Sequence, residues 1–308
     1  MGCMKPARMR LETTTFDPTQ LPQILDLFAN QFARYDKLLQ PGYLRWLYEQ
    51  NPFGKAKTVQ AFEGEILIGF LAMIPVQLVA SEEVREAFHV VNVLVHPQYQ
   101  GKKIFARMIT SVSELAASTK ALLIGYPNPQ SVGSWKRAGM QFHEPLIPKL
   151  IAPSRKRAGF RSGEVSDMTQ LSDVLHELES QRAEKQYLRV RLSPEFIAWR
   201  YVGHPTKKYR IQLVWRKNKA AGLLITERFY PGINLTLDHI VSSGLEAECL
   251  SFLPWLTVVL EPAVREPKAP VRNLQLPVKR RIPLFCTDLA RALPIGTARK
   301  LRASVSDF

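Results

Sequence analysis

Long apolar runs, broken by short polar turns, mark the secondary structure of the first half of the chain. One run, ILIGFLAMIPVQLVA, covers 66–80. Gly69, Pro75 and Gln77 interrupt it, which predicts a hairpin within a core. The run is shorter than the roughly 20 residues that cross a bilayer, so no transmembrane segment is expected. A second run, VVNVLV at 90–95, stops before a proline and predicts a strand.

A helix is predicted to follow this strand. A polar turn follows the strand, and its Gly101 is expected to open the helix. Beyond it, apolar residues recur three and four positions apart. These residues are Ile104, Phe105, Met108, Ile109, Val112, Leu115 and Ala116. The spacing gives the helix one apolar face, so we expect one of its sides to be buried.

Two parts of the chain resemble each other. DPTQLPQIL at 17–25 is similar to DMTQLSDVL at 167–175. Further on, 43–72 aligns without a gap on 196–225. In this alignment Trp46, Tyr48, Pro52 and Gly69 fall on Trp199, Tyr201, Pro205 and Gly222. A repeat of this length indicates duplicated domains and not a solenoid. The Trp and Tyr of each copy are expected to pack in its core.

Each copy is predicted to fold in the same order: a strand, a helix, a helical turn carrying the Trp and Tyr, and two strands, the second with an internal glycine. The basic segment at 149–163, with its proline and glycines, is the expected boundary. We therefore expect a first domain at 1–150 and a second at 160–308. Only the first copy has the Gln-x-x-Gly turn at 98–101, so one active site per chain is expected.

The composition is that of a globular protein: of 308 residues, 46% are hydrophobic and 22% charged. Its three cysteines, Cys3, Cys249 and Cys286, lie far apart without metal-ligand spacing. This pattern argues against a disulfide scaffold and fits a reducing compartment. The first residues lack the apolar run of a signal peptide. The expectation is a cytoplasmic protein without a metal site.

The net charge of +15 is unevenly distributed. Residues 1–150 hold 16 Lys and Arg against 12 Asp and Glu, whereas 151–308 hold 26 against 15. Basic clusters occur at 155–161, 279–281 and 299–302. Such a field favours an anionic partner, which could be a CoA-type ligand, a nucleic acid, an anionic glycan or a membrane face. Simple solubility of a basic protein is the competing explanation.

The turn at 98–103 suits a phosphate group. The start of a helix leaves backbone N–H groups unpaired and carries the positive end of the helix dipole, where phosphate oxygens bind. Gly101 allows the backbone to approach a ligand closely. Lys102 and Lys103 add positive charge. Turns of this kind are also common in proteins without a ligand there.

The motifs around this turn resemble those of the GNAT acyltransferase superfamily. The first signature of that superfamily is Gln/Arg-x-x-Gly-x-Gly/Ala, and the second is an Asn after a strand, then a helix ending in Tyr-x-x-x-Gly-Phe. Gln98, Gly101 and Lys103 occupy the first, and Asn128, Trp135, Gly139 and Met140 the second. The resemblance covers about 10–145, and through the repeat it extends weakly to 160–260. It implies a mixed α/β fold of two tandem GNAT-like domains, each a central sheet flanked by helices, the second degenerate.

The resemblance also implies an acyl-CoA cosubstrate, usually acetyl-CoA. The pyrophosphate would bind at the turn that begins with Gln98. It would contact the backbone amides of the next residues: Gln100, Gly101, Lys102, Lys103, Ile104 and Phe105. The pantetheine arm would pair with the backbone around Val93 and Val95. Asn128 and Ser131 would line the far side of the thioester cleft.

Two positions depart from the family pattern. Lys103 stands where Gly or Ala is usual, and Trp135 stands where the family has a tyrosine acid. An indole cannot protonate a thiolate near neutral pH, so other residues must be considered. His89 is the candidate base and Tyr126 the candidate acid, although ordinary packing would also explain both.

Together these features predict an N-acyltransferase that moves an acetyl group from acetyl-CoA to an amine: an amino sugar, a small amine or a peptide amine. One alternative is a non-catalytic acyl-CoA-binding or interaction module, favoured by Lys103 and Trp135. Another is a Fem-like transferase that takes its acyl group from aminoacyl-tRNA, favoured by the basic second half. The Gln-x-x-Gly turn argues against nucleic acid as the main partner.

Overall fold

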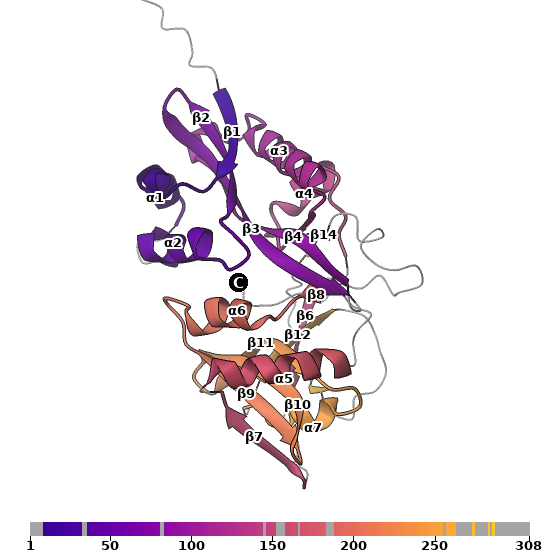
Figure 1. Cartoon of the computed structure of the whole chain (residues 1–308). Coiled ribbons are helices and arrows are strands. Elements are labelled where there is room, and N and C mark those ends of the chain that lie inside the picture. The colour runs from indigo at the N-terminus through magenta and orange to yellow at the C-terminus, as the bar shows by residue number, and fades with distance from the viewer. Residues whose placement is uncertain are drawn as a thin grey trace, which may run out of the picture. The chain divides into compact units, whose positions relative to one another are not determined.

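The computed structural model describes residues 9–32, 36–80, 83–143, 146–151, 158–165, 167–182, 188–254, 257–262, 273–274, 283 and 285–286. The chain divides into two compact units. The first unit consists of Met1–Gln77, Arg85–Phe142 and Phe285–Asp288, and the second of Leu78–Val84, His143–Leu284 and Leu289–Phe308. Each unit is built around its own sheet (Figure 1).

The first unit contains a mixed sheet in the order β1-β2-β3-β4-β5-β14. Its strands are β1 (Met9–Thr15), β2 (Lys57–Glu63), β3 (Ile66–Ala80), β4 (Glu83–Val95), β5 (Leu122–Gly125) and β14 (Phe285–Cys286). Its helices are η1 (Pro18–Gln20), α1 (Leu21–Ala29), η2 (Lys37–Leu39), α2 (Pro41–Glu49), η3 (Pro97–Tyr99), α3 (Ile104–Thr119) and α4 (Val132–Arg137). β1, β2 and β3 pair antiparallel, β5 runs parallel to β4, and β14 pairs antiparallel with β5.

Helices cover both faces of this sheet, with α1 and α2 on one side and α3 on the other (Figure 1). Adjacent residues of β3 show how the faces are assigned, because neighbouring side chains on a strand point in opposite directions. The ring of Phe70 contacts Phe28 of α1 and Tyr48 of α2, with centroids 5.5 and 5.8 Å away. Gly69 faces Met108 of α3.

The sheet of the second unit has the order β7-β9-β10-β11-β12-β6-β13. Its first six strands correspond in order to β1-β2-β3-β4-β5-β14 of the first sheet. The strands are β6 (Leu146–Ile151), β7 (Phe160–Glu164), β8 (Arg189–Val190), β9 (Tyr209–Arg216), β10 (Lys219–Tyr230), β11 (Ile233–Val241), β12 (Thr257–Pro262) and β13 (Asn273–Leu274). The helices are α5 (Met168–Gln181), α6 (Pro194–Ile197), η4 (Ala198–Val202) and α7 (Glu246–Leu250). β8 is not part of this second sheet: it pairs with Leu78 and Val79 near the end of β3, and these residues of β3 belong to the second unit. β12 is parallel to β11, as β5 is to β4. The predicted fold class, mixed α/β with each sheet flanked by helices, is confirmed.

The two units share local devices as well as strand order. Asp17 accepts a hydrogen bond from the amide of Thr19 at 2.9 Å, and Asp167 accepts one from the amide of Thr169 at 2.8 Å. Each bond caps the start of the first helical segment of its unit. The predicted packing role of the aromatic pairs is also confirmed, because their four side chains are buried: Trp46, Tyr48, Trp199 and Tyr201.

In each sheet, the strand that pairs antiparallel with the second strand of the parallel pair comes from an unexpected part of the chain. β6 follows the first copy along the chain, yet it pairs antiparallel with β12 in the second sheet. β14, near the end of the chain, pairs antiparallel with β5 in the first sheet. The two copies have therefore exchanged strands. The predicted domain limits at 1–150 and 160–308 stay a prediction.

The predicted hairpin within 66–80 is wrong, because β3 is a single strand over this whole range. Gly69 makes no turn there: a Cβ at this position would lie 3.0 Å from the Sδ of Met108, so the glycine allows α3 to approach the sheet. Pro75 also stays in the strand, since its fixed φ suits extended backbone. Its carbonyl accepts a hydrogen bond from Asn51 Nδ2 at 2.8 Å.

The helix predicted after β4 exists, and its apolar face is confirmed. Five of its residues are buried: Ile104, Met108, Ile109, Val112 and Ala116. The prediction that Gly101 opens the helix is wrong, because α3 begins at Ile104. Gly101 has φ 80° and Lys103 has φ 60°, and a right-handed helix cannot include such residues. None of the helices that the structure describes is long and apolar enough to cross a bilayer.

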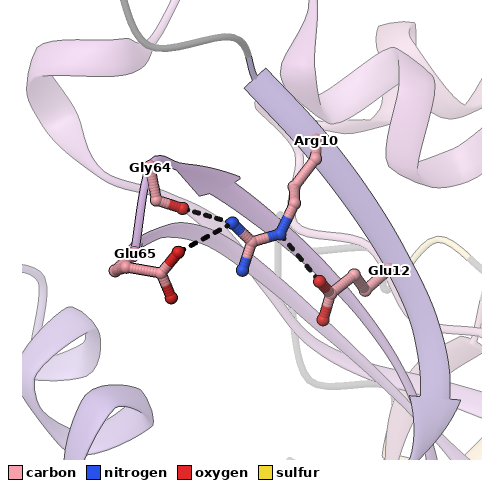
Figure 2. A network of polar contacts seen from close by, with 4 residues as sticks. All are labelled: Arg10, Glu12, Gly64 and Glu65. Atoms are coloured by element: carbon pink, nitrogen blue, oxygen red, sulfur yellow. Dashed lines mark hydrogen bonds and ion pairs between the residues drawn. The ribbon is translucent and has the colours of Figure 1, made fainter.

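At the β2–β3 hairpin, Arg10 of β1 joins three groups (Figure 2). Its Nε donates to Glu12 at 2.7 Å, and its Nη1 contacts the Gly64 carbonyl and the Glu65 carboxylate. The guanidinium also lies over the Phe62 ring, 4.5 Å from its centroid. These exposed ion pairs contribute little stability, but they tie β1 to the end of β2 that carries Glu63.

Candidate functional site

The start of α3 is an open helix N-terminus. Lys103 stands at the N-cap position, and its side chain makes no capping hydrogen bond. The first turn of α3 contains no acidic residue. Its first N–H groups are therefore available to an anion, at the positive end of a helix 16 residues long. Gln98, Gln100, Gly101, Lys102 and Lys103 are all exposed, whereas Ile104 is buried and Phe105 partly buried.

Tyr99 fixes this turn to the sheet. Its hydroxyl donates to Glu63 Oε2 at 2.6 Å, and the carboxylate raises the pKa of Tyr99. The Lys102 ammonium lies over the Tyr99 ring, 4.5 Å from the centroid. The amide of Gln98 donates to His96 Nδ1 at 3.3 Å. The exposed turn thus has a defined position at the end of β2 and β4.

β4 and β5 separate just before this turn. Their parallel pairing covers Ala87 to Val90 and stops at the Val90–Gly125 pair. Two residues on, Asn92 has φ 52°, a left-handed conformation inside a strand. The other edge of β4 stays attached, because the amide of His96 donates to the Ile68 carbonyl of β3 at 2.8 Å.

Val93 and Val95, predicted to hold the pantetheine arm, lie beyond this separation. The Val95 carbonyl accepts hydrogen bonds from Gln31 Nε2 at 2.7 Å and from Gln100 Nε2 at 3.4 Å. A pantetheine amide bound there would replace the Gln31 amide. Sequence reasoning missed Gln31, whose one signal is that it falls on Gln181 at the offset of 150 that relates 17–25 to 167–175.

The structure brings the two candidate catalytic residues together. The rings of His89 on β4 and Tyr126 directly after β5 lie edge to face, with centroids 5.4 Å apart. Tyr126 is partly exposed, but only 5% of His89 is exposed. His89 also lies where β4 and β5 are still paired, opposite Ile124. A proton taken by His89 would therefore have to reach it through Tyr126 or water.

Asn128 and Ser131 bond to each other. The amide of Ser131 donates to Asn128 Oδ1 at 2.8 Å, and the Ser131 hydroxyl donates to the Asn128 carbonyl at 3.1 Å. These bonds shape the turn from β5 into α4. Trp135 of α4 is buried, with its ring 5.7 Å from that of Phe105 in an edge-to-face contact. The indole supports the first turn of α3 from behind.

The second unit has no comparable anion site in its described residues. The amide of Gly244, at the turn before α7, donates to Glu246 Oε1 at 3.1 Å. Glu246 and Glu248 lie in the first turn of α7, which has only five residues. The carbonyl of His239, near the end of β11, accepts from Arg182 Nη2 at 3.3 Å. The chain's own side chains thus occupy these positions.

Much of the predicted basic surface lies outside the described residues. This holds for 155–157 of the first cluster and for the clusters at 279–281 and 299–302. The described residues hold no group of three His, Cys, Asp or Glu that could bind a metal ion.

Comparisons with known proteins bear on the fold and on the first half of the sequence. Residues 13–141 match the sequence profile of the family described as acetyltransferase (GNAT) domain. A GCN5-related N-acetyltransferase from Anabaena variabilis has a TM-score of 0.67 at 14% identity, covering 90% of this chain and 72% of that one. A tandem GNAT protein from the clavulanic acid biosynthesis pathway has a TM-score of 0.53 at 14% identity, covering 90% and 98%.

Saccharomyces cerevisiae N-myristoyltransferase, solved with bound myristoyl-CoA, has a TM-score of 0.50 at 12% identity, covering 83% of this chain and 78% of that one. No curated protein matches the chain. The fold is that of the GNAT N-acyltransferases, and the sequence match to the acetyltransferase (GNAT) domain is confined to residues 13–141.

Proposed function

We propose that this protein is an N-acyltransferase that moves an acetyl group from acetyl-CoA to an amine acceptor. The observation that carries the proposal is a junction: the open N-terminus of α3 follows directly on the point where β4 leaves β5. One part of this junction suits a diphosphate and the other an extended amide chain. Acyl-CoA contains both groups in this order.

In this proposal the diphosphate of the coenzyme binds the turn at 98–105, where it would meet the amides from Gly101 to Phe105. The predicted contact of the Gln100 amide is not part of the proposal, because that N–H donates to the Pro97 carbonyl at 3.3 Å. Lys102 and Lys103 supply positive charge at its exposed edge. The pantetheine arm runs along Val93 and Val95. One of its amides donates to the Val95 carbonyl in place of the Gln31 side chain. The thioester then lies toward Asn92, within the space that opens where β4 and β5 part.

The reaction joins the acceptor nitrogen to the acetyl carbon. The neutral amine attacks the thioester carbonyl, the carbon–sulfur bond breaks, and CoA leaves as a thiolate that takes up a proton. We assign the acid to Tyr126, which is partly exposed beside the gap. His89 contacts the Tyr126 ring and would accept the proton of the amine through water. Much of the rate would come from holding the two reactants together.

One coenzyme per chain is expected. In the second unit, the Glu246 carboxylate accepts a hydrogen bond from the amide of Gly244, and Arg182 donates one to the carbonyl of His239. These backbone groups are therefore already bonded within the protein. We therefore propose that residues 160–308 form a degenerate GNAT-like domain that shapes the acceptor site. The acceptor is an amino sugar, a small amine or a peptide amine.

A second candidate function is binding of acyl-CoA without catalysis. The observation that favours it is Trp135, which is buried where the family has its acid and so cannot replace it. Both candidates use the same coenzyme site, and only turnover distinguishes them.

Calorimetric titration with acetyl-CoA and with CoA tests the coenzyme site. Gly101→Glu places a carboxylate at the turn and should abolish micromolar binding. Gly244→Glu is the matched control: Gly244 has φ 76° beside 80° for Gly101, and neither position has atoms within 4 Å of an added Cβ. The strain is thus the same, but coenzyme binding should remain.

Absence of binding in the unmodified protein would contradict the proposal. Release of free thiol from acetyl-CoA in the presence of a panel of amines then separates the transferase from the binding module. Binding without release on any amine supports the module.

A further inference from the structure

Asn92 has a conformation that something in the fold must maintain. Its φ of 52° lies in the left-handed region, which costs most non-glycine residues of the order of 1 kcal/mol or more. Three other described non-glycine residues have positive φ: Lys103, Lys120 and Lys217. Those three stand at helix ends or in a hairpin turn, whereas Asn92 lies within β4.

Tyr48 of α2 holds the side chain of Asn92. Asn92 Nδ2 donates to the Tyr48 hydroxyl at 2.6 Å. Tyr48 is completely buried, and its ring packs against Phe16 and Phe70 at centroid distances of 5.1 and 5.8 Å. Burial raises the pKa of Tyr48, so the phenol stays protonated. The hydroxyl is therefore a fixed point to which β4 is tied.

The hydrogen bond acts where β4 changes partners. Pairing with β5 ends two residues before Asn92, at Val90. Pairing with β3 continues beyond it, at His96 and Ile68. The left-handed residue thus lies between a segment that has two neighbouring strands and a segment that has one. The backbone of the second segment is what an extended ligand would meet.

The second unit provides an internal comparison. Tyr201 of η4, which aligns with Tyr48, donates to Asp238 of β11. The pairing of β11 with β12 ends at Thr236, again two residues before the bonded residue. Asp238, however, does not have positive φ. The tyrosine bond therefore belongs to both copies, whereas the left-handed residue occurs only in the copy with the open turn.

We propose that Tyr48 is a positioning residue for the coenzyme: its hydrogen bond keeps Asn92 left-handed and so maintains the gap between β4 and β5 that receives the pantetheine arm. This inference rests on the proposed function, because it assigns a residue to that same site. Tyr48 itself is buried and touches no ligand.

Two probes separate this role from general stability. One is CoA, and the other is adenosine 3′-phosphate 5′-diphosphate, which has the nucleotide and diphosphate of CoA without pantetheine. Tyr48→Phe keeps the ring but removes the acceptor of the Asn92 bond. This substitution should weaken CoA binding about tenfold, which corresponds to the loss of one buried hydrogen bond. The affinity for the fragment should stay within about twofold of its original value.

Asn92→Gly supplies a rescue. Glycine adopts a left-handed conformation without support, so in the Asn92→Gly background Tyr48→Phe should change the CoA affinity less than about twofold. Asn92→Ala, made without touching the buried ring, should show the same selective loss of CoA as Tyr48→Phe. Tyr201→Phe is the matched control, since it removes the corresponding hydrogen bond of the second unit and should leave both affinities unchanged.

Three results overturn the inference while leaving the proposed function intact: CoA binding that is indifferent to Tyr48→Phe, equal losses for CoA and the fragment, or no rescue by Asn92→Gly. A loss of CoA affinity in Tyr201→Phe as large as that in Tyr48→Phe also overturns it, because the effect is then one of general stability. If the unmodified protein binds neither probe, the proposed function falls and this inference falls with it.

Discussion

Tyr99 donates a hydrogen bond to Glu63 at 2.6 Å and thereby ties the turn before α3 to the end of β2. The same end of β2 adjoins Gly64 and Glu65, which Arg10 binds from β1 (Figure 2). The first three strands therefore support a turn that is itself exposed. This arrangement explains how an open helix N-terminus can keep one geometry without a side-chain cap.

Removing the hydrogen bond between Tyr99 and Glu63 should weaken the binding of every ligand that contacts the turn. Tyr99→Phe keeps the ring beneath Lys102 but loses the bond to Glu63. We expect about threefold weaker binding of both CoA and adenosine 3′-phosphate 5′-diphosphate in calorimetry. Equal losses would distinguish Tyr99 from Tyr48, whose substitution should affect CoA alone. Unchanged affinity for the fragment would mean that the turn keeps its position without Tyr99.

The same bond should give a pH dependence at alkaline pH. The Glu63 carboxylate raises the pKa of Tyr99 above its ordinary value of 10 in the folded protein. A raised folded pKa stabilises the fold fully below the unfolded pKa and loses that effect as pH rises through the folded value. The difference in unfolding free energy between the unmodified protein and Tyr99→Phe should be constant near neutral pH and shrink above about pH 10. Denaturant titrations at several pH values measure it, and a constant difference across this range would contradict the assignment.

Gly69 should not tolerate a side chain, since α3 approaches the sheet closely there. A Cβ would lie 3.0 Å from Met108 Sδ and 3.2 Å from Ala61 Cβ. Gly69→Ala should lower the unfolding free energy by about 1–3 kcal/mol, the usual cost of overpacking. Gly42→Ala in α2 is the control, because nothing lies within 4 Å of a Cβ added there. Denaturant unfolding should show that variant to be unchanged or slightly stabilised.

Cys249 should resist thiol reagents in the folded protein. The side chain is fully buried, its thiol donates to the Ala221 carbonyl at 3.3 Å, and burial raises its pKa to about 12. Thiolate, the reactive form, is then scarce. Mass spectrometry after labelling should find Cys249 modified only once denaturant is added. Rapid labelling under native conditions would show that α7 opens readily from β10.

The sequence revealed those parts of the fold that depend on local periodicity. The face of α3 was predictable because apolar spacing alone determines which side of a helix is buried. The repeat was visible because Trp46 and Tyr48 of one copy stay in register with Trp199 and Tyr201 of the other. The position of an open turn at 98–103 was also predictable, since Gly101 interrupts a strand-to-helix pattern.

Other features depend on contacts between distant residues and could not be predicted from local sequence. Glycine serves both tight turns and close packing, so Gly69 suggested a hairpin where its true role is contact with α3. Asn92 and Tyr48 are 44 positions apart, and the sequence around either residue does not predict their hydrogen bond. Gln31 lies 64 positions from Val95, and its match to Gln181 gives no indication of that contact. The predicted ligand residues stay predictions until binding is measured.

The exchange of β6 and β14 has a consequence for how the protein is made. The strand that leaves the ribosome directly after the first copy completes the sheet of the second. The first sheet obtains its last strand from Phe285–Cys286, and Phe285 lies 160 positions (285 − 125) after its partner Gly125. Biosynthesis therefore supplies the edge of the first sheet only after the strands of the second sheet have been made. A truncated message would yield the coenzyme turn on a sheet with an unprotected edge at β5, which is a template for aggregation.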